Sequence, residues 1–160
     1  MEINSKEFQS FLNLSETLTA FTSFQLQGTG QAEEYFLTIQ KGIGKNILQE
    51  LLVTFDKIKT EAQDDKILLD KALRHEILGH DKLGPFTRSI IKLWFVGTWY
   101  QLPDHWLEKY GSSSNQTTYV VSPNAYKEGL LWPTIGAHPM GAKAPGYGTW
   151  TAPPKIPKIN

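Results

Sequence analysis

The chain has 160 residues, with sixteen basic and sixteen acidic side chains and a formal net charge of zero. This length suits one domain with a substantial core, and the balanced charge argues against a nucleic-acid binder, which usually carries a basic surplus. Cysteine is absent from the sequence, which excludes disulfides, thiol catalysis and cysteine-ligated metal centres within this chain.

Neither a targeting segment nor a membrane segment is predicted. Residues 1–8 lack a basic region followed by an apolar run, so they do not resemble a signal peptide. The longest apolar run, residues 90–96, is interrupted by Lys92 and is far too short to span a bilayer. The chain as written is expected to be cytoplasmic, or periplasmic if it is exported with a partner or if a signal has been removed.

Apolar residues recur at helical spacing in the first part of the chain. The first expected helix covers residues 4–26, with Asn4 or Ser5 as its N-cap. The second covers residues 31–41 and ends at the two glycines that follow. The residues expected to face inward are Phe8, Phe11, Leu12, Leu18 and Phe21 in the first helix, and Ala32, Tyr35, Phe36 and Ile39 in the second.

Two further helices are expected before residue 80. Asn46 is the predicted cap of a third helix, which has the cleanest amphipathic pattern of the chain. A fourth helix is expected to start at Asp64 or Asp65 and to close at Gly79. The inward residues are Ile47, Leu48, Leu51, Leu52, Phe55 and Ile58 in the third helix, and Ile67, Leu68, Ala72, Leu73 and Ile77 in the fourth.

The rest of the chain is expected to be organised around a central helix at about residues 86–101. Pro85 suits a first helical turn, and apolar side chains cover most of the circumference, which is typical of a helix surrounded by protein. Gly97 costs about 1 kcal/mol relative to alanine inside a helix, which indicates a close approach to the backbone. Pro103 is expected to end the helix. The predicted fold class is therefore all-α, a bundle of four to five helices around this central helix.

After the central helix the pattern changes. Residues 104–110 are expected to form one or two helical turns and residues 111–116 a flexible loop. Residues 117–121 are β-branched and aromatic enough for a short extended segment. Ser122 followed by a proline predicts the start of a brief helix through residue 131.

A helical domain at residues 1–132 is expected to carry an extended C-terminal arm, residues 133–160, within the same single domain. The arm is rich in proline and glycine, so no helix or central strand is predicted in it. A disordered tail would be poor in apolar and aromatic residues. The arm is therefore expected to lie on its own helical body or on another protein, and the candidate partner-binding residues are Trp132, Met140, Tyr147 and Trp150.

The sequence predicts no catalytic residue, no cofactor-binding residue and no metal ligand in this chain. His75 and His80 are not spaced to share a helix face and are interpreted as surface or cap residues. Ser15 and Ser122 lack the glycine frame of a nucleophile elbow. The glycine-rich turns do not continue as a dinucleotide or phosphate-binding fingerprint.

The tryptophans allow two interpretations. Trp94, Trp99, Tyr100 and Trp106 could stack a sugar or a flavin, but core packing is the commoner explanation at this spacing. The tryptophans beside prolines in the last part of the chain fit a core position and an interface position equally well.

Several short apolar stretches follow one another in a characteristic order. They are Phe-Leu-Asn-Leu-Ser-Glu-Thr-Leu-Thr-Ala-Phe at 11–21, Ala-Glu-Glu-Tyr-Phe at 32–36, Ile-Lys-Leu-Trp-Phe-Val-Gly at 91–97, and the end segments 126–132 and 145–153. In this order they resemble the small subunit of membrane-associated, FAD-containing sorbitol and fructose dehydrogenases, which is related to the small subunit of bacterial FAD-dependent glucose dehydrogenase.

The resemblance implies a non-catalytic accessory subunit. In that family a large partner of the glucose–methanol–choline type holds FAD and oxidises a polyol or sugar hydroxyl. The small subunit supports the folding of this partner, and its twin-arginine signal carries the pair across the membrane. The present sequence has no twin-arginine signal, and Ala20 stands where the family has glycine. We expect a hetero-oligomer with the FAD-binding subunit, with no cofactor in this chain, no nucleic acid and no direct membrane insertion.

Two alternatives remain at this point. One is a free-standing helical binding or regulatory protein without a redox partner. The other is an enzyme that binds flavin itself, although no phosphate-cradling loop on a βαβ unit supports it.

Overall fold

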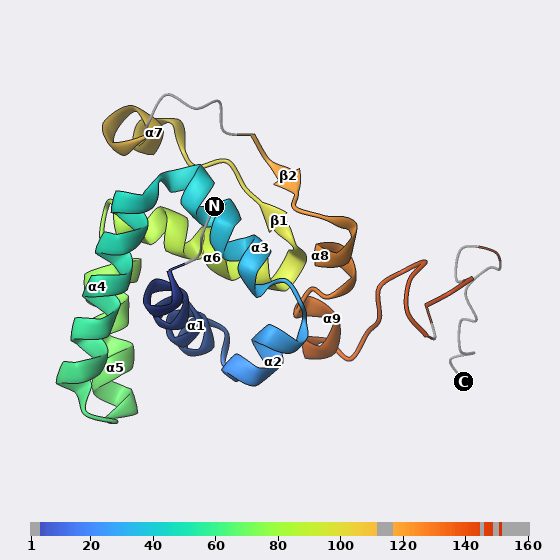
Figure 1. Cartoon of the computed structure of the whole chain (residues 1–160), viewed down its shortest axis with the longest axis horizontal. Helices are drawn as coiled ribbons and strands as arrows, with labels where there is room; N and C mark the ends of the chain where they lie inside the picture. The colour runs from blue at the N-terminus through green and yellow to red at the C-terminus, as the bar shows by residue number, and fades with distance from the viewer. Residues whose placement is uncertain (1–3, 112–116, 145, 149–150, 152–160) are drawn as a thin grey trace, which may run out of the picture.

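The computed structural model describes residues 4–111, 117–144, 146–148 and 151, and this part of the chain is mainly helical (Figure 1). The all-α prediction is confirmed. The α-helices are α1 (Ser5–Thr19), α2 (Ser23–Gly28), α3 (Ala32–Ile43), α4 (Lys45–Ala62), α5 (Lys66–Ala72), α6 (Leu83–Val96), α7 (Asp104–Tyr110), α8 (Pro123–Lys127) and α9 (Leu131–Thr134). A π-helix, η1 (Leu73–Leu78), follows α5, and the two short strands are β1 (Thr98–Trp99) and β2 (Tyr119–Val120).

The first expected helix is two helices in the structure. Asn4 caps α1, since its side chain accepts a hydrogen bond from the Lys6 N–H at 3.0 Å. The helix stops at Ala20, which has a left-handed φ of 62°. A reciprocal capping box between Thr22 and Gln25 then begins α2. The prediction of one continuous helix over 4–26 was wrong because it overlooked this local start signal.

The boundary between α3 and α4 also differs from the prediction. Helix α3 continues through Gly42 and ends at Gly44, whose φ is 84°. Helix α4 begins directly after Gly44 without a side-chain cap, so the predicted cap at Asn46 was wrong. A Cβ at position 42 would lie 2.6 Å from a ring carbon of Trp99, which explains a glycine inside α3.

The α5 segment combines one correct prediction and one wrong one. Asp65 caps the helix, accepting hydrogen bonds from the Ile67 and Leu68 N–H groups. These two side chains were expected to face inward but are 71% and 47% exposed. The helix changes to a π-helix at Leu73. Because a π turn holds more residues than an α turn, one helical period does not describe the whole segment.

The central helix is shorter than expected. It is α6, and it ends where Gly97 adopts a left-handed φ of 66°. The expected extension to residue 101 was wrong, because Thr98 and Trp99 form β1 and pair antiparallel with Val120 and Tyr119 of β2. This pairing confirms the extended segment predicted at 117–121.

Gly97 confirms the expected close approach to the backbone. A Cβ at this position would lie 2.5 Å from the carbonyl group of Ala125 in α8. The end of α6 therefore packs closely against α8, which lies almost thirty residues later in the chain.

The core forms between α1, α3, α4 and α6, whose arrangement Figure 1 shows. Trp94 of α6 is 1% exposed and lies in its centre, as the central-helix interpretation predicts. Its ring stacks on Phe11 of α1 at 6.1 Å and meets Tyr35 of α3 edge-on at 4.9 Å. Its indole N–H donates a hydrogen bond to the Ser15 hydroxyl at 3.0 Å, so the polar atom of the buried ring is satisfied.

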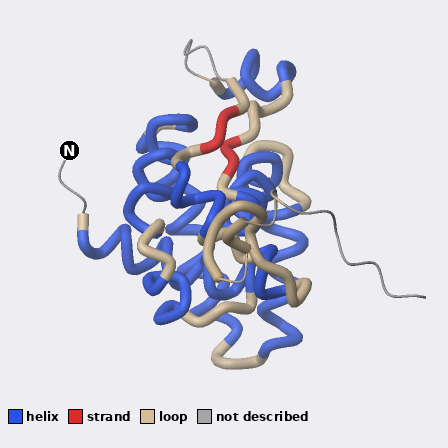
Figure 2. Tube along the Cα trace, turned by 90° about the vertical axis from the view of Figure 1, so that its right-hand side faces the viewer, coloured by secondary structure: helices blue, strands red, loops and turns tan. Residues whose placement is uncertain are grey.

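The last part of the fold leads into the arm. Ser122 caps α8, as predicted, but this helix ends at Lys127, and α9 follows after Gly129. Pro133 lies within α9, which contradicts the expectation that no helix forms from this residue on. Pro133 is the third residue of the helix, where a backbone N–H would have no intrahelical acceptor. The missing N–H of proline therefore costs no hydrogen bond at this position. The expected boundary between domain and arm thus falls inside α9. Figure 2 looks onto the side from which the arm leaves and shows the two strands confined to one short stretch.

Candidate partner-binding surface

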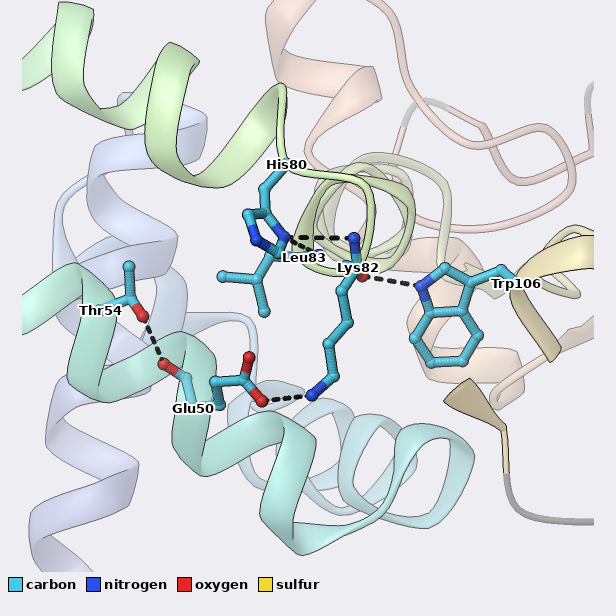
Figure 3. A network of polar contacts seen from close by, with 6 residues as sticks. All are labelled: Glu50, Thr54, His80, Lys82, Leu83 and Trp106. Carbon is cyan, nitrogen blue, oxygen red and sulfur yellow. Dashed lines mark hydrogen bonds and ion pairs between the residues drawn. The ribbon is translucent and has the colours of Figure 1, made fainter. Parts of the chain in front are cut away.

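His80, just before α6, has a structural role. The imidazole Nδ1 of His80 accepts hydrogen bonds from the Lys82 and Leu83 N–H groups at the start of the helix (Figure 3). His80 is therefore a cap residue, as predicted. In the same network Lys82 forms an ion pair with Glu50 of α4, and its carbonyl accepts a hydrogen bond from the Trp106 indole at 2.7 Å. The network ties α4, α6 and α7 together.

The described residues contain neither a candidate metal site nor a candidate membrane span. No group of three or more histidine, aspartate or glutamate side chains in this part of the chain could hold a metal ion. Over the same residues, no helix has both the length and the apolar character needed to cross a bilayer.

The two serines considered as nucleophiles take part in the fold. Ser15 is buried and accepts the hydrogen bond from Trp94. The hydroxyl of Ser122 caps α8 and donates to Gln31 at 3.2 Å. Both side chains therefore position helices.

Most of the tryptophans in the described residues belong to the core. Trp94, Trp99 and Trp106 are 1%, 2% and 1% exposed, so core packing is the correct explanation for them. Trp132 is only half-buried and lies at the start of the arm. Trp150 lies outside the described residues, as does most of the predicted loop at 111–116.

Side-chain contacts hold the arm to the two short helices that precede it. The Trp132 indole N–H donates to the Tyr126 carbonyl at 2.8 Å, and the Tyr126 hydroxyl donates to the Met140 carbonyl at 3.3 Å. Lys143 forms an ion pair with Glu128 at 2.6 Å. Two of the predicted partner-binding residues, Trp132 and Met140, are thus brought together through Tyr126.

The arm also contains a tight turn of its own. Pro139 and Gly146 are buried at the two ends of this turn. A Cβ on Gly146 would lie 2.4 Å from the Pro139 carbonyl oxygen and 2.2 Å from that of Ala142. Only glycine fits such a position without moving the backbone. The Tyr147 N–H donates to the Lys143 carbonyl at 3.0 Å, which closes the turn.

The large apolar side chains among the described residues of the arm are exposed. Ile135 is 60% exposed, Met140 46% and Tyr147 70%. The hydrophobic core contains no described residue after Leu130. Figure 1 shows the chain after α9 running away from the helical body. The described part of the arm is therefore ordered by its turn and by polar contacts to the preceding residues, while its large apolar side chains stay in solvent.

A cleft of about 480 Å³ separates the start of the arm from α2. Phe21, Gln25 and Gly28 line it on one side. Trp132 and His138 are among the residues that line it on the other.

Phe24 of α2 was not singled out by the sequence analysis. It is 84% exposed, the highest exposure among the large apolar side chains described. Its neighbours Gln25 and Gly28 in the same helix line the cleft, whereas Phe24 itself does not. Recognising the Thr22–Gln25 capping box in the sequence could have shown that a separate short helix presents this residue.

Few titratable groups are strongly perturbed, and those few have structural causes. Burial raises the pKa of the Tyr35 phenol, and the charges of Glu34 and Glu128 add to the increase. Hydrogen bonds from Lys109 and then from the Tyr110 hydroxyl lower the pKa of Asp81. The second case is an exposed surface pair between α7 and the loop before α6.

Three of the short apolar stretches of the sequence meet in the structure. Residues 11–21, 32–36 and 91–97 belong mainly to α1, α3 and α6, whose side chains surround Trp94. The stretch at 126–132 includes the two residues that fix the start of the arm, Tyr126 and Trp132. No protein-family model, no curated protein and no solved structure matches the chain.

Proposed function

We propose that this chain is a non-catalytic accessory subunit that binds and stabilises a FAD-dependent sugar or polyol dehydrogenase of the glucose–methanol–choline type. FAD is held by the partner. The observation that carries the proposal is the arm, which keeps Ile135, Met140 and Tyr147 exposed although its own contacts order it. The resemblance of the sequence stretches supplies the identity of the partner.

The arm is suited to binding because part of the ordering cost is met before the partner arrives. Six prolines between residues 133 and 157 restrict the free chain. The Glu128–Lys143 ion pair and the hydrogen bond between Tyr126 and Met140 fix the path of the described segment. A segment that is already ordered loses less conformational entropy on binding, so more of the contact energy appears as affinity.

The large side chains of the arm are of the types that dominate interfaces. Tryptophan and tyrosine are enriched among residues whose truncation costs about 2 kcal/mol or more of binding energy. Tyr147 and Trp150 belong to these types, and Met140 adds an adaptable apolar contact.

A truncation separates the arm from the helical body. A chain ending at Ala137 keeps α9 and the hydrogen bond from the Ala137 N–H to the Trp132 carbonyl. We expect this chain to fold, because the core contains no described residue after Leu130. It should lose measurable binding to the FAD-containing dehydrogenase of the same organism. The measurements are co-purification of the two chains with the flavin spectrum of the complex, and a circular-dichroism melt of the truncated chain.

Each outcome has a defined meaning. If the full chain does not bind the flavoprotein, the accessory-subunit proposal is wrong and the free-standing binding or regulatory protein is favoured. If the truncated chain binds as well as the full chain, the arm is not the binding element. If the truncated chain does not fold, the arm belongs to the structural core.

A further inference from the structure

The docking surface extends beyond the arm onto the helical body. The cleft of about 480 Å³ has α2 on one side and the start of the arm on the other. Phe24 of α2 is next in sequence to the lining residue Gln25 and is 84% exposed, and Ile135 lies in sequence between the lining residues Pro133 and Ala137 and is 60% exposed. Leu26, on the opposite side of α2, is fully buried and anchors this short helix to the core. The anchored helix α2 therefore holds the Phe24 side chain in solvent.

The charged residues of the cleft and the arm indicate the chemistry of a binding partner. Three of the sixteen basic residues and none of the sixteen acidic residues lie after Glu128. The cleft is lined by Lys127 and Lys143, and Glu128 is the one acidic residue that lines it. Lys143 is paired with Glu128, which leaves the charge of Lys127 uncompensated within the cleft lining. The cleft and the arm together thus combine apolar side chains with a positive charge surplus.

We propose that α2 and the arm are the two walls of one docking surface, and that its occupant is a segment of the FAD-containing subunit with an apolar or aromatic side chain flanked by carboxylates. This inference rests on the proposed function and adds the chemistry of the partner segment. The apolar side chain fills the cleft next to α2, and the carboxylates face Lys127. Complementary charge of this kind speeds association and fixes the orientation of the partner.

The apolar half of the inference is tested with Phe24→Ala. An exposed side chain can be truncated without opening a cavity, so this variant should fold like the unaltered chain. Ile67→Ala is the matched control, because Ile67 is 71% exposed on α5 and does not line the cleft. The affinity of each chain for the purified FAD-containing subunit is measured by titration. We expect Phe24→Ala to weaken binding by about tenfold or more, the effect of a truncated interface anchor, and Ile67→Ala to leave it unchanged.

The charge half is tested with Lys127→Gln. Lys71→Gln is the matched control, since both lysines occupy the last turn of a short helix. We expect only the Lys127 variant to bind more weakly and to lose part of its salt dependence. The binding of the unaltered chain should weaken as salt approaches about 1 M, where the screening length falls to about 3 Å.

The outcomes distinguish this inference from the proposed function. No binding by the unaltered chain overturns both. Binding that is insensitive to Phe24→Ala and to Lys127→Gln overturns the shared docking surface while the accessory-subunit function stands. Sedimentation of the chain alone as a dimer that Phe24→Ala dissociates would assign the surface to a second copy and also overturn the inference.

Discussion

The helical body and the arm use the same kinds of side chain in opposite ways. In the body, Trp94 is surrounded by rings from two other helices, and its N–H has a buried partner. In the arm, Tyr147 is 70% exposed although the turn that carries it is closed by hydrogen bonds. Aromatic content alone therefore does not distinguish a core from a binding surface. What distinguishes them is whether the surrounding backbone brings other apolar residues to the ring.

The two regions also differ in what holds them together. The body is stabilised by burial of apolar surface around α6, which is a large and cooperative contribution. The described part of the arm is held by a few polar contacts to Tyr126, Glu128 and Trp132. Substitutions should therefore have large effects on the unfolding of the body and small effects in the arm, which the following predictions test in order of expected size.

The largest effect is expected for Trp94→Ala. The substitution removes the ring in contact with Phe11 and Tyr35 and leaves the Ser15 hydroxyl without its donor. We expect a loss of about 3–5 kcal/mol in the free energy of unfolding, as for other large-to-small core changes. Urea denaturation followed by circular dichroism measures it. Tyr147→Ala is the comparison in the arm, because Tyr147 is 70% exposed, and an equal loss there would contradict the distinction between the two regions.

Gly97→Ala should have the next largest effect. The residue has φ 66°, and a Cβ would lie 2.5 Å from the Ala125 carbonyl oxygen. Left-handed backbone alone costs about 1–2 kcal/mol for a residue with a Cβ, and displacement of α8 adds to this cost. Gly28→Ala is the control, because nothing lies within 4 Å of a Cβ at that position. We expect a clear drop in melting temperature for the first variant and none for the second.

Local signals in the sequence predicted part of the fold well. Ser122 was predicted as a cap, and Asn4 and Asp65 were each one of two predicted candidates, because the cap bond is made within three residues. The inward face of α4 followed from its regular period. These features depend only on neighbouring residues, so one sequence is enough to predict them.

Other features depend on residues far apart in the chain and were predicted wrongly or not at all. The end of α6 at Gly97 is linked to the approach of Ala125. The change to a π-helix at Leu73 is not marked in the apolar period, and Ile67 is exposed although that period placed it inward. The cleft joins α2 to residues more than one hundred positions later, so the role suggested for Phe24 required the structure.

A smaller effect is expected for Tyr35→Phe. The Tyr35 hydroxyl is the only buried side-chain polar atom of the described residues without a hydrogen-bond partner. Removing it relieves a desolvation cost, so the free energy of unfolding should stay the same or rise by about 1 kcal/mol. Loss of more than this amount would show that the hydroxyl has a partner.

The same variant has a pH signature. Because burial raises the pKa of Tyr35, its folded form stays protonated when the unfolded form ionises. The stability contribution is therefore complete below the unfolded pKa of about 10 and falls as pH rises above it, by up to about 1.4 kcal/mol per pH unit. Tyr35→Phe should flatten this decline in denaturation curves measured above that pH.

The smallest effect on global stability is expected for Glu128→Gln, which removes the charge that pairs with Lys143. The two side chains are 30% and 45% exposed, and an ion pair this accessible contributes between zero and about 1 kcal/mol. Glutamine keeps the size of the side chain. Altering Lys143 would be less informative, because its φ of 52° makes the backbone sensitive to the residue type.

The informative measurement for Glu128→Gln is amide hydrogen exchange. The Tyr147 N–H donates to the Lys143 carbonyl in the arm, whereas the Gly97 N–H donates to the Leu93 carbonyl in the body. If polar contacts alone hold the arm, loss of the ion pair should speed exchange at Tyr147 several-fold and leave Gly97 unchanged, because local opening costs less free energy than global unfolding. Equal acceleration at both amides would mean that the arm and the body unfold together, and the contrast between the two regions would not hold.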